Sequence, residues 1–126
     1  MDVVERWHDY VKSGDPAALE ALIGEDCVFH SPAVHTPQIG RVLTVRYLTA
    51  AMLVLKRPDF RYVGEWRAER SAVLEFMLSI DGIQIDGVDM IRWDADGRIT
   101  EFKVMMRPLK ALNTILPLMA SRLTYG

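Results

Sequence analysis

The stretch Ser71–Arg107, SAVLEFMLSIDGIQIDGVDMIRWDADGRITEFKVMMR, decides the fold of this chain. It consists of three apolar runs separated by two short turns, at Asp81–Gly82 and Asp94–Gly97. An acidic residue followed by glycine between apolar runs is the strongest local signal for a β-hairpin. The stretch therefore predicts three antiparallel strands in succession, at Ala72–Ile80, Ile83–Trp93 and Arg98–Arg107.

Helices and two further strands are predicted outside this stretch, from the helical spacing of apolar residues and the breakers between segments. The helices are Val3–Lys12, Pro16–Ile23 ended by Gly24, Arg41–Leu55, and Leu109–Leu123, kinked or split at Pro117; the strands are Cys27–His30 and Phe60–Ala68. Helices followed by an antiparallel meander indicate an α+β fold. A cone-shaped, curved antiparallel sheet wrapped around the N-terminal helices would leave a concave interior suited to a small ligand.

Length and composition narrow the functional classes. The 126 residues fit a single domain, 1–126, and the net charge of −2 gives no general attraction to nucleic acid or to membranes. Cys27 is the one cysteine, so an internal disulfide is excluded, and no Cys/His cluster suggests a metal. We expect no cofactor. No signal-peptide pattern or membrane-length apolar run is present, so we expect a cytoplasmic protein.

The interior face of the meander follows from strand alternation, because successive side chains point to opposite faces. In the first strand one face is wholly apolar and includes Phe76 and Leu78. In the third strand Phe102 and Met106 alternate with charged residues. We expect these four side chains to line the interior of the cone.

Asp89, in the middle of the second strand, is the candidate functional residue. Alternation aims it into the same interior, where desolvation would raise the pKa of its carboxyl. A neutral carboxyl can donate a hydrogen bond to a ligand oxygen. The alternative is a solvated carboxylate, or one paired with Arg92 or Arg107, and a one-residue change of register would reverse its direction.

Two segments, WHDYVKSGDPAALEALIGEDCVFHS (Trp7–Ser31) and GVDMIRWDADGRITEFKVMMRPL (Gly87–Leu109), carry a resemblance to a known family. With the Gly40 helix between them, they resemble the nuclear-transport-factor-2-like superfamily, and within it the SnoaL-like and ketosteroid-isomerase-like group. The resemblance extends over nearly the whole chain, to about Leu112. It implies a cystatin-like α+β barrel, a single SnoaL-like domain, and a pocket for a small hydrophobic molecule such as a steroid or a polyketide.

The resemblance also assigns site residues by position. The oxyanion-hole aspartic acid of the isomerases falls on Asp89, their tyrosine falls on Trp7, and their general base falls on Ser31. An indole donates a weaker hydrogen bond than a phenol, and a serine cannot take up a proton at neutral pH. His35 or His30 is the substitute base that we consider, because imidazole titrates near neutrality.

Three functional hypotheses follow. In the first, the chain binds a small hydrophobic molecule through Asp89, with Trp7, Ser31, His30, Tyr47, Phe76, Leu78, Phe102 and Met106 around it. In the second, it is an isomerase, cyclase or lyase in which Asp89 and His35 are catalytic. In the third, the cone is filled by its own large side chains and the domain serves protein interaction.

A homodimer is expected under each hypothesis. The outer face of the predicted sheet carries Val73, Met77 and Met105 among charged residues. Apolar side chains grouped on an exposed face are typical of a surface that a second copy covers.

Overall fold

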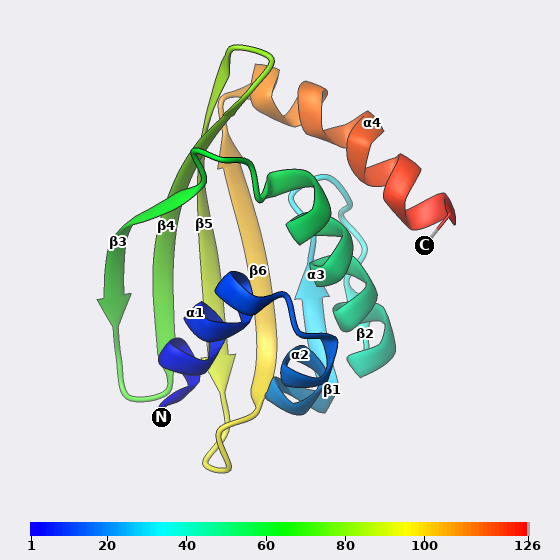
Figure 1. Ribbon diagram of the computed structural model, residues 1–126. Coiled ribbons are helices and arrows are strands. Elements are labelled where there is room, and N and C mark those ends of the chain that lie inside the picture. Colours follow the sequence, from blue (N-terminus) through cyan, green and yellow to red (C-terminus); the bar gives the residue numbers. More distant parts are fainter. Residues whose placement is uncertain (126) are drawn as a thin grey trace.

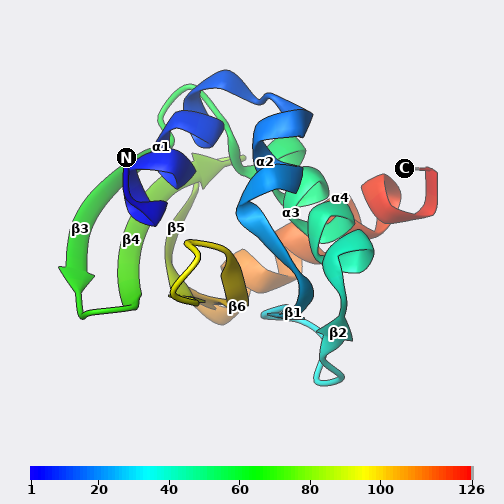
Figure 2. The ribbon, with the colours of Figure 1, turned by 90° about the horizontal axis from the view of Figure 1, so that it is seen from below.

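The computed structural model describes residues 1–125 and shows four helices and six strands (Figure 1). The helices are α1 (Val3–Ser13), α2 (Pro16–Leu22), α3 (Arg41–Leu55) and α4 (Leu109–Tyr125). The strands are β1 (Ile23–His30), β2 (Gln38–Ile39), β3 (Arg61–Arg67), β4 (Ser71–Ile80), β5 (Ile83–Trp93) and β6 (Ile99–Arg107). Viewed from below, the sheet curls and the helices gather in its concave side (Figure 2).

The six strands form one sheet in the order β2-β1-β6-β5-β4-β3. The α+β cone predicted from the sequence is confirmed, with one difference: β1 pairs with β6 in parallel, so the sheet is mixed. The expected end of the second helix at Gly24 is wrong, because β1 already begins at Ile23. A Cβ on Gly24 would lie 3.0 Å from the carbonyl oxygen of Ile99, so glycine permits the close approach of β1 to β6.

The meander β4-β5-β6 is built as its turns predict. Asp81 and Gly82 both have positive φ, 52° and 77°, the geometry that a two-residue hairpin turn requires. The alternation is also confirmed: every second residue of β4 is buried, as are Ile85, Asp89 and Ile91 of β5. This register places Leu74, Asp89 and Val104 side by side across the three strands.

The helices close the concave side of the sheet. The Asp2 carboxylate caps α1 by accepting from Glu5 N at 2.9 Å, and Trp7 of this helix packs on Phe102 of β6, with ring centroids 4.8 Å apart. Of the two expectations for Pro117, a kink or a split, the split does not occur, because α4 continues through Pro117 as one helix. Proline removes one helical hydrogen bond there, the one to the carbonyl of Asn113, a residue on the exposed side of the helix.

None of the helices within residues 1–125 is long and apolar enough to cross a membrane. Over the same residues, no three His, Cys, Asp or Glu side chains come together as a metal-binding group.

Candidate functional site

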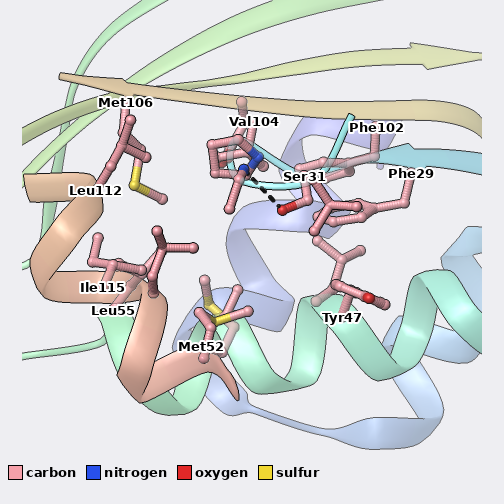
Figure 3. Close-up of a pocket in the computed structure, with 18 of the residues that line it drawn as sticks. Phe29, Ser31, Tyr47, Met52, Leu55, Phe102, Val104, Met106, Leu112 and Ile115 are labelled. Carbon is pink, nitrogen blue, oxygen red and sulfur yellow. Dashed lines mark hydrogen bonds between the residues drawn. The ribbon is translucent and has the colours of Figure 1, made fainter. Parts of the chain in front are cut away.

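A cavity of about 150 Å³ lies between the concave face of the sheet and the helices α3 and α4 (Figure 3). Its wall is almost entirely apolar. The lining residues come from α1 (Trp7), from β1 and the loop after it (Phe29, Ser31, Pro32, Ala33, Val34), from α3 and the segment after it (Tyr47, Leu48, Ala51, Met52, Leu55, Phe60), from the sheet (Phe76, Asp89, Phe102, Val104, Met106) and from α4 (Leu112, Ile115, Leu116, Met119, Ala120, Leu123).

The mouth of the cavity lies between the loop after β1 and the C-terminal half of α4. There the lining residues Val34 and Leu116 are 41% and 42% exposed, whereas Trp7 and Phe102, on the inner wall, are 1% and 0% exposed. Arg46 of α3 donates to the carbonyl oxygen of Leu123, which ties the end of α4 to α3 beside the opening. A ligand would therefore enter along α4 and meet an apolar interior.

Asp89 is the one carboxyl group on the cavity wall of the described chain, and it is only 5% exposed. Its Oδ2 accepts a hydrogen bond from the Tyr62 hydroxyl of β3 at 2.7 Å. The same hydroxyl accepts from Nε1 of Trp7 on α1 at 2.9 Å. Three elements distant in sequence thus converge on one carboxyl group.

Burial raises the pKa of Asp89 to about 7, and the hydrogen bond from Tyr62 opposes this only partly. The pairing with Arg92 or Arg107 considered from the sequence does not occur. Arg92 lies 3.4 Å from Glu101, and Arg107 lies 3.8 Å from Asp86, both on the outer face. A carboxyl group without a cationic partner is neutral over much of the range below pH 7.

Burial and the neighbouring Asp89 carboxyl also raise the pKa of Tyr62 well above its ordinary value. Its hydroxyl therefore keeps its proton at neutral pH. Tyr62 remains a hydrogen-bond donor to Asp89 whether the carboxyl group is neutral or charged.

Most of the residues predicted for the site do meet at this cavity. Seven line it: Asp89, Trp7, Ser31, Tyr47, Phe76, Phe102 and Met106. Figure 3 shows Tyr47, Phe29, Phe102 and Met106 around the same space, with Met52, Leu55 and Ile115 on the helical side. Ser31 lies toward the mouth, and its Oγ accepts from the backbone N of Ala33 at 3.2 Å.

Three predicted residues do not line the cavity. His30 faces the outer side of the sheet, where its Nε2 lies 3.7 Å from Glu101, because it alternates with the inward-facing Phe29. His35 is exposed in the loop beyond Val34. Leu78 is fully buried on the inner face, opposite Ile85, and packs in the core. The cavity wall therefore offers no imidazole as a base.

Two parts of the site were not assigned to it from the sequence. Tyr62, the hydrogen-bond partner of Asp89, was not among the residues predicted for the site. The apolar spacing of Leu109–Leu123 predicted a helix but not its position, and the structure places Leu112, Ile115 and Met119 of α4 in the wall. Both depend on how distant segments meet, which local patterns do not encode.

This arrangement restricts the chemistry of an occupant. An engineered apolar cavity of about 150 Å³ accommodates benzene, so the enclosed space fits about one ring. The occupant must be apolar where it touches the wall, and it can place one oxygen against Asp89. Anything larger must extend toward the mouth or displace flexible side chains such as Met52 and Met106.

Comparisons with known proteins agree with this architecture. The family model described as SnoaL-like domain matches residues 4–102. A steroid delta-isomerase from Pseudomonas aeruginosa is 34% identical with a TM-score of 0.91, covering 98% of this chain and 90% of that one. A protein from Silicibacter pomeroyi, described as uncharacterised with a cystatin-like fold, is 28% identical with a TM-score of 0.86, covering 95% and 84%.

A protein from Mesorhizobium loti, described as NTF2-like and of unknown function, is 27% identical with a TM-score of 0.70, covering 84% of this chain and 88% of that one. A search of curated protein sequences found no match.

Proposed function

The chain belongs to the SnoaL-like domain family, and we propose that it binds a small, mostly apolar molecule whose single inward-facing oxygen accepts a hydrogen bond from neutral Asp89. The main observation in support of this proposal is a carboxyl group without a cationic partner on the wall of an otherwise apolar cavity. Binding sites for small molecules typically combine apolar walls with a few placed polar groups. A ketone or aldehyde oxygen suits such a donor.

The size of the cavity limits the part of the ligand that is enclosed. A steroid or polyketide would place one ring or one chain end inside, with the remainder along Leu116, Met119 and the loop after β1. We therefore regard a one-ring ketone as the minimal probe, because it fills the space and offers an acceptor but no donor.

The proposal is tested with acetophenone and ethylbenzene, two probes of similar size that differ in the carbonyl oxygen. We expect acetophenone affinity for the wild type to fall as pH rises through about 7, since ionised Asp89 has no proton to donate. Ethylbenzene affinity should not depend on pH. Ligand-observed NMR titrations at pH 5.5 and 8.5 measure both.

Asp89→Asn is the matched variant, because its amide can accept from Tyr62 and donate N–H toward the cavity at any pH. We expect it to bind acetophenone without a pH dependence. Binding of ethylbenzene but not acetophenone at pH 5.5 would contradict the role of Asp89. Failure of both probes to bind would favour the hypothesis of an interaction domain with a closed cone.

The second candidate function is proton-transfer isomerisation, favoured by the 34% identity to a steroid delta-isomerase. Since neither His30 nor His35 reaches the cavity, Asp89 itself would have to move the proton. Its pKa of about 7 suits this role. Ionised Asp89 would remove a proton from the carbon between the carbonyl and the double bond of a β,γ-unsaturated ketone, and return it to the γ-carbon as the double bond shifts into conjugation.

Turnover of 3-cyclohexenone, followed by the absorbance of the conjugated product, tests this second function. Asp89→Asn separates it from binding, because the variant retains a donor but cannot accept a proton. Activity in the wild type that is lost in the variant, with acetophenone binding retained, supports catalysis. Equal rates in both proteins would contradict it.

We also propose that a second copy of the chain covers the outer face of the sheet. Trp66 and Met105 are 59% and 49% exposed there, beside charges of both signs such as Arg92 and Glu101. A two-fold interface pairs a patch with itself and therefore favours a patch with both signs. Sedimentation equilibrium should report a dimer that Trp66→Glu weakens, and a monomeric wild type would contradict the proposal.

A further inference from the structure

We infer that Tyr62 is a positioning residue that directs Asp89: by donating to Oδ2, it leaves Oδ1 as the atom through which Asp89 meets a ligand, and it places the proton of neutral Asp89 on Oδ1. This inference rests on the proposed ligand-binding role of Asp89. It specifies which oxygen of Asp89 meets the ligand, and it assigns a function to a tyrosine on β3.

The direction of the hydrogen-bond chain follows from counting protons. Indole Nε1 is a donor only, so in its 2.9 Å contact Trp7 must donate and the Tyr62 oxygen must accept. Tyr62 has one hydroxyl proton, and its other polar contact within residues 1–125 is Asp89 Oδ2 at 2.7 Å. The Tyr62 proton must therefore point at Asp89. A hydroxyl group in place of the indole could either donate or accept, so the direction of the Tyr62 hydrogen bond would then be undetermined.

The same count places the proton of neutral Asp89. Oδ2 already faces the Tyr62 proton, so a second proton on that side would oppose it. Oδ1 has no hydrogen-bond partner across the described chain, and the carboxyl group forms part of the cavity wall. A protonated Oδ1 is thus a donor aimed at an occupant, and an ionised Oδ1 is an acceptor at the same place.

The surroundings of Asp89 supply no competing charge. Its neighbours across the sheet are Leu74 of β4 and Val104 of β6. Among the titratable groups that the structure describes, Tyr62 of β3 bonds to it, and Tyr47 of α3 lies on the cavity wall; α1 contributes Trp7, and α4 contributes apolar side chains. The state of Asp89 therefore depends chiefly on burial and on Tyr62.

The Tyr62 ring is held rigidly enough to position a carboxyl group. A bulge in β3 after Tyr62 keeps this residue opposite Phe76 on the inner face while Val63 turns outward. Edge-to-face contacts hold the ring on three sides, with His8 at 5.0 Å, Phe60 at 5.3 Å and Phe76 at 6.2 Å between centroids. Such packing fixes the hydroxyl group before a ligand arrives.

Tyr62→Phe tests the inference, since it retains the ring and its packing but removes the donor. The hydrogen bond from Tyr62 favours the charged form of Asp89. Its loss should raise the pH midpoint of acetophenone binding by about one unit, the size expected for one hydrogen bond to a carboxylate. Ethylbenzene affinity should stay within about twofold, because the wall keeps its shape.

Tyr10→Phe is the control: Tyr10 is a buried tyrosine that packs on Trp7 at 5.4 Å and does not bond to Asp89. It should leave the midpoint unchanged. A Tyr62→Phe midpoint equal to that of the wild type would overturn the inference, even if affinity fell.

A readout without ligand separates this inference from the proposed function. In protein labelled with ¹³C at aspartate carboxyl groups, the Asp89 resonance should titrate at higher pH in Tyr62→Phe than in the wild type. If acetophenone does not bind but the resonance shifts in this way, the proposed function fails and the positioning role stands. If acetophenone binds with the expected pH dependence and the resonance does not shift, the positioning role fails alone.

Discussion

Asp86 and Asp89 lie on the same strand, β5, and face opposite sides of the sheet. Asp86 is on the outer face, with its side chain 23% exposed and Arg107 at 3.8 Å. Asp89 is on the inner face, with apolar residues around it and one tyrosine as its partner. The two carboxyl groups thus meet different surroundings: a guanidinium group and water in one place, and an apolar wall with one tyrosine hydroxyl in the other.

The difference shows that strand alternation alone can place two aspartates of one strand in unlike surroundings, although they are close in sequence. Water and a nearby guanidinium stabilise a charge on the outer face, whereas the inner face offers neither. The role that we propose for Asp89 depends on these surroundings rather than on its residue type. Substitutions on either face of β5 therefore test this contrast.

The largest expected effect is on the pH dependence of stability. Because the pKa of Asp89 is raised in the folded state, the folded protein keeps a proton that the unfolded chain releases, so this contribution is lost as pH rises from about 4 through about 7. Relative to Asp89→Asn, the wild type should lose about 3 kcal/mol of unfolding free energy between pH 5 and pH 8. Urea unfolding at both pH values measures the difference, and parallel curves for the two proteins would refute it.

The next effect comes from Gly87, which lies between the two aspartates. An added Cβ there would lie 2.7 Å from Cε2 of Phe76, a buried ring stacked on Phe60. Gly87→Ala should therefore destabilise the protein by about 2 kcal/mol and weaken ethylbenzene binding, because Phe76 must move within the wall. Val88→Ala, on the outer face of the same strand, should cost less and leave binding unchanged. Unaltered stability and binding in Gly87→Ala would show that the wall is not packed as described.

The smallest effect is expected on the outer face. Asp86→Asn removes the partner of a largely exposed Arg107, and such surface pairs contribute little. The unfolding free energy at pH 7 should change by less than about 0.5 kcal/mol. The pH dependence of acetophenone binding should match that of the wild type. A change as large as that in Asp89→Asn would mean that the two faces do not differ as we describe.

Strand alternation placed Asp89 on the same face as the apolar residues of the meander, but the sequence did not determine the register that aims it. The structure decides this, because β5 pairs with β4 without a break and the register shift between β5 and β6 lies beyond Asp89, at Arg92–Trp93. The same alternation explains why His30 is turned away from the cavity. Local patterns carry the alternation because successive side chains of a strand point to opposite faces.

The partnership of Asp89 with Tyr62 could not be predicted in the same way. It depends on the bulge in β3 between Tyr62 and Gly64 and on the approach of Trp7 from α1. A glycine within a strand is typical of a bulge, so Gly64 indicates the bulge but not which carboxyl group Tyr62 meets. The parallel pairing of β1 with β6 and the placement of α4 against the cavity also join segments distant in the chain. Periodicity identifies such elements but does not determine where they dock.

The protonation of Asp89 is measured directly by titrating its carboxyl group by ¹³C NMR in the wild-type protein, with Asp89→Asn used to assign the resonance. We expect a midpoint of about 7. A midpoint near the ordinary value of 3.8 would mean that Asp89 is charged in the folded protein, and would contradict its role as a neutral donor in the cavity.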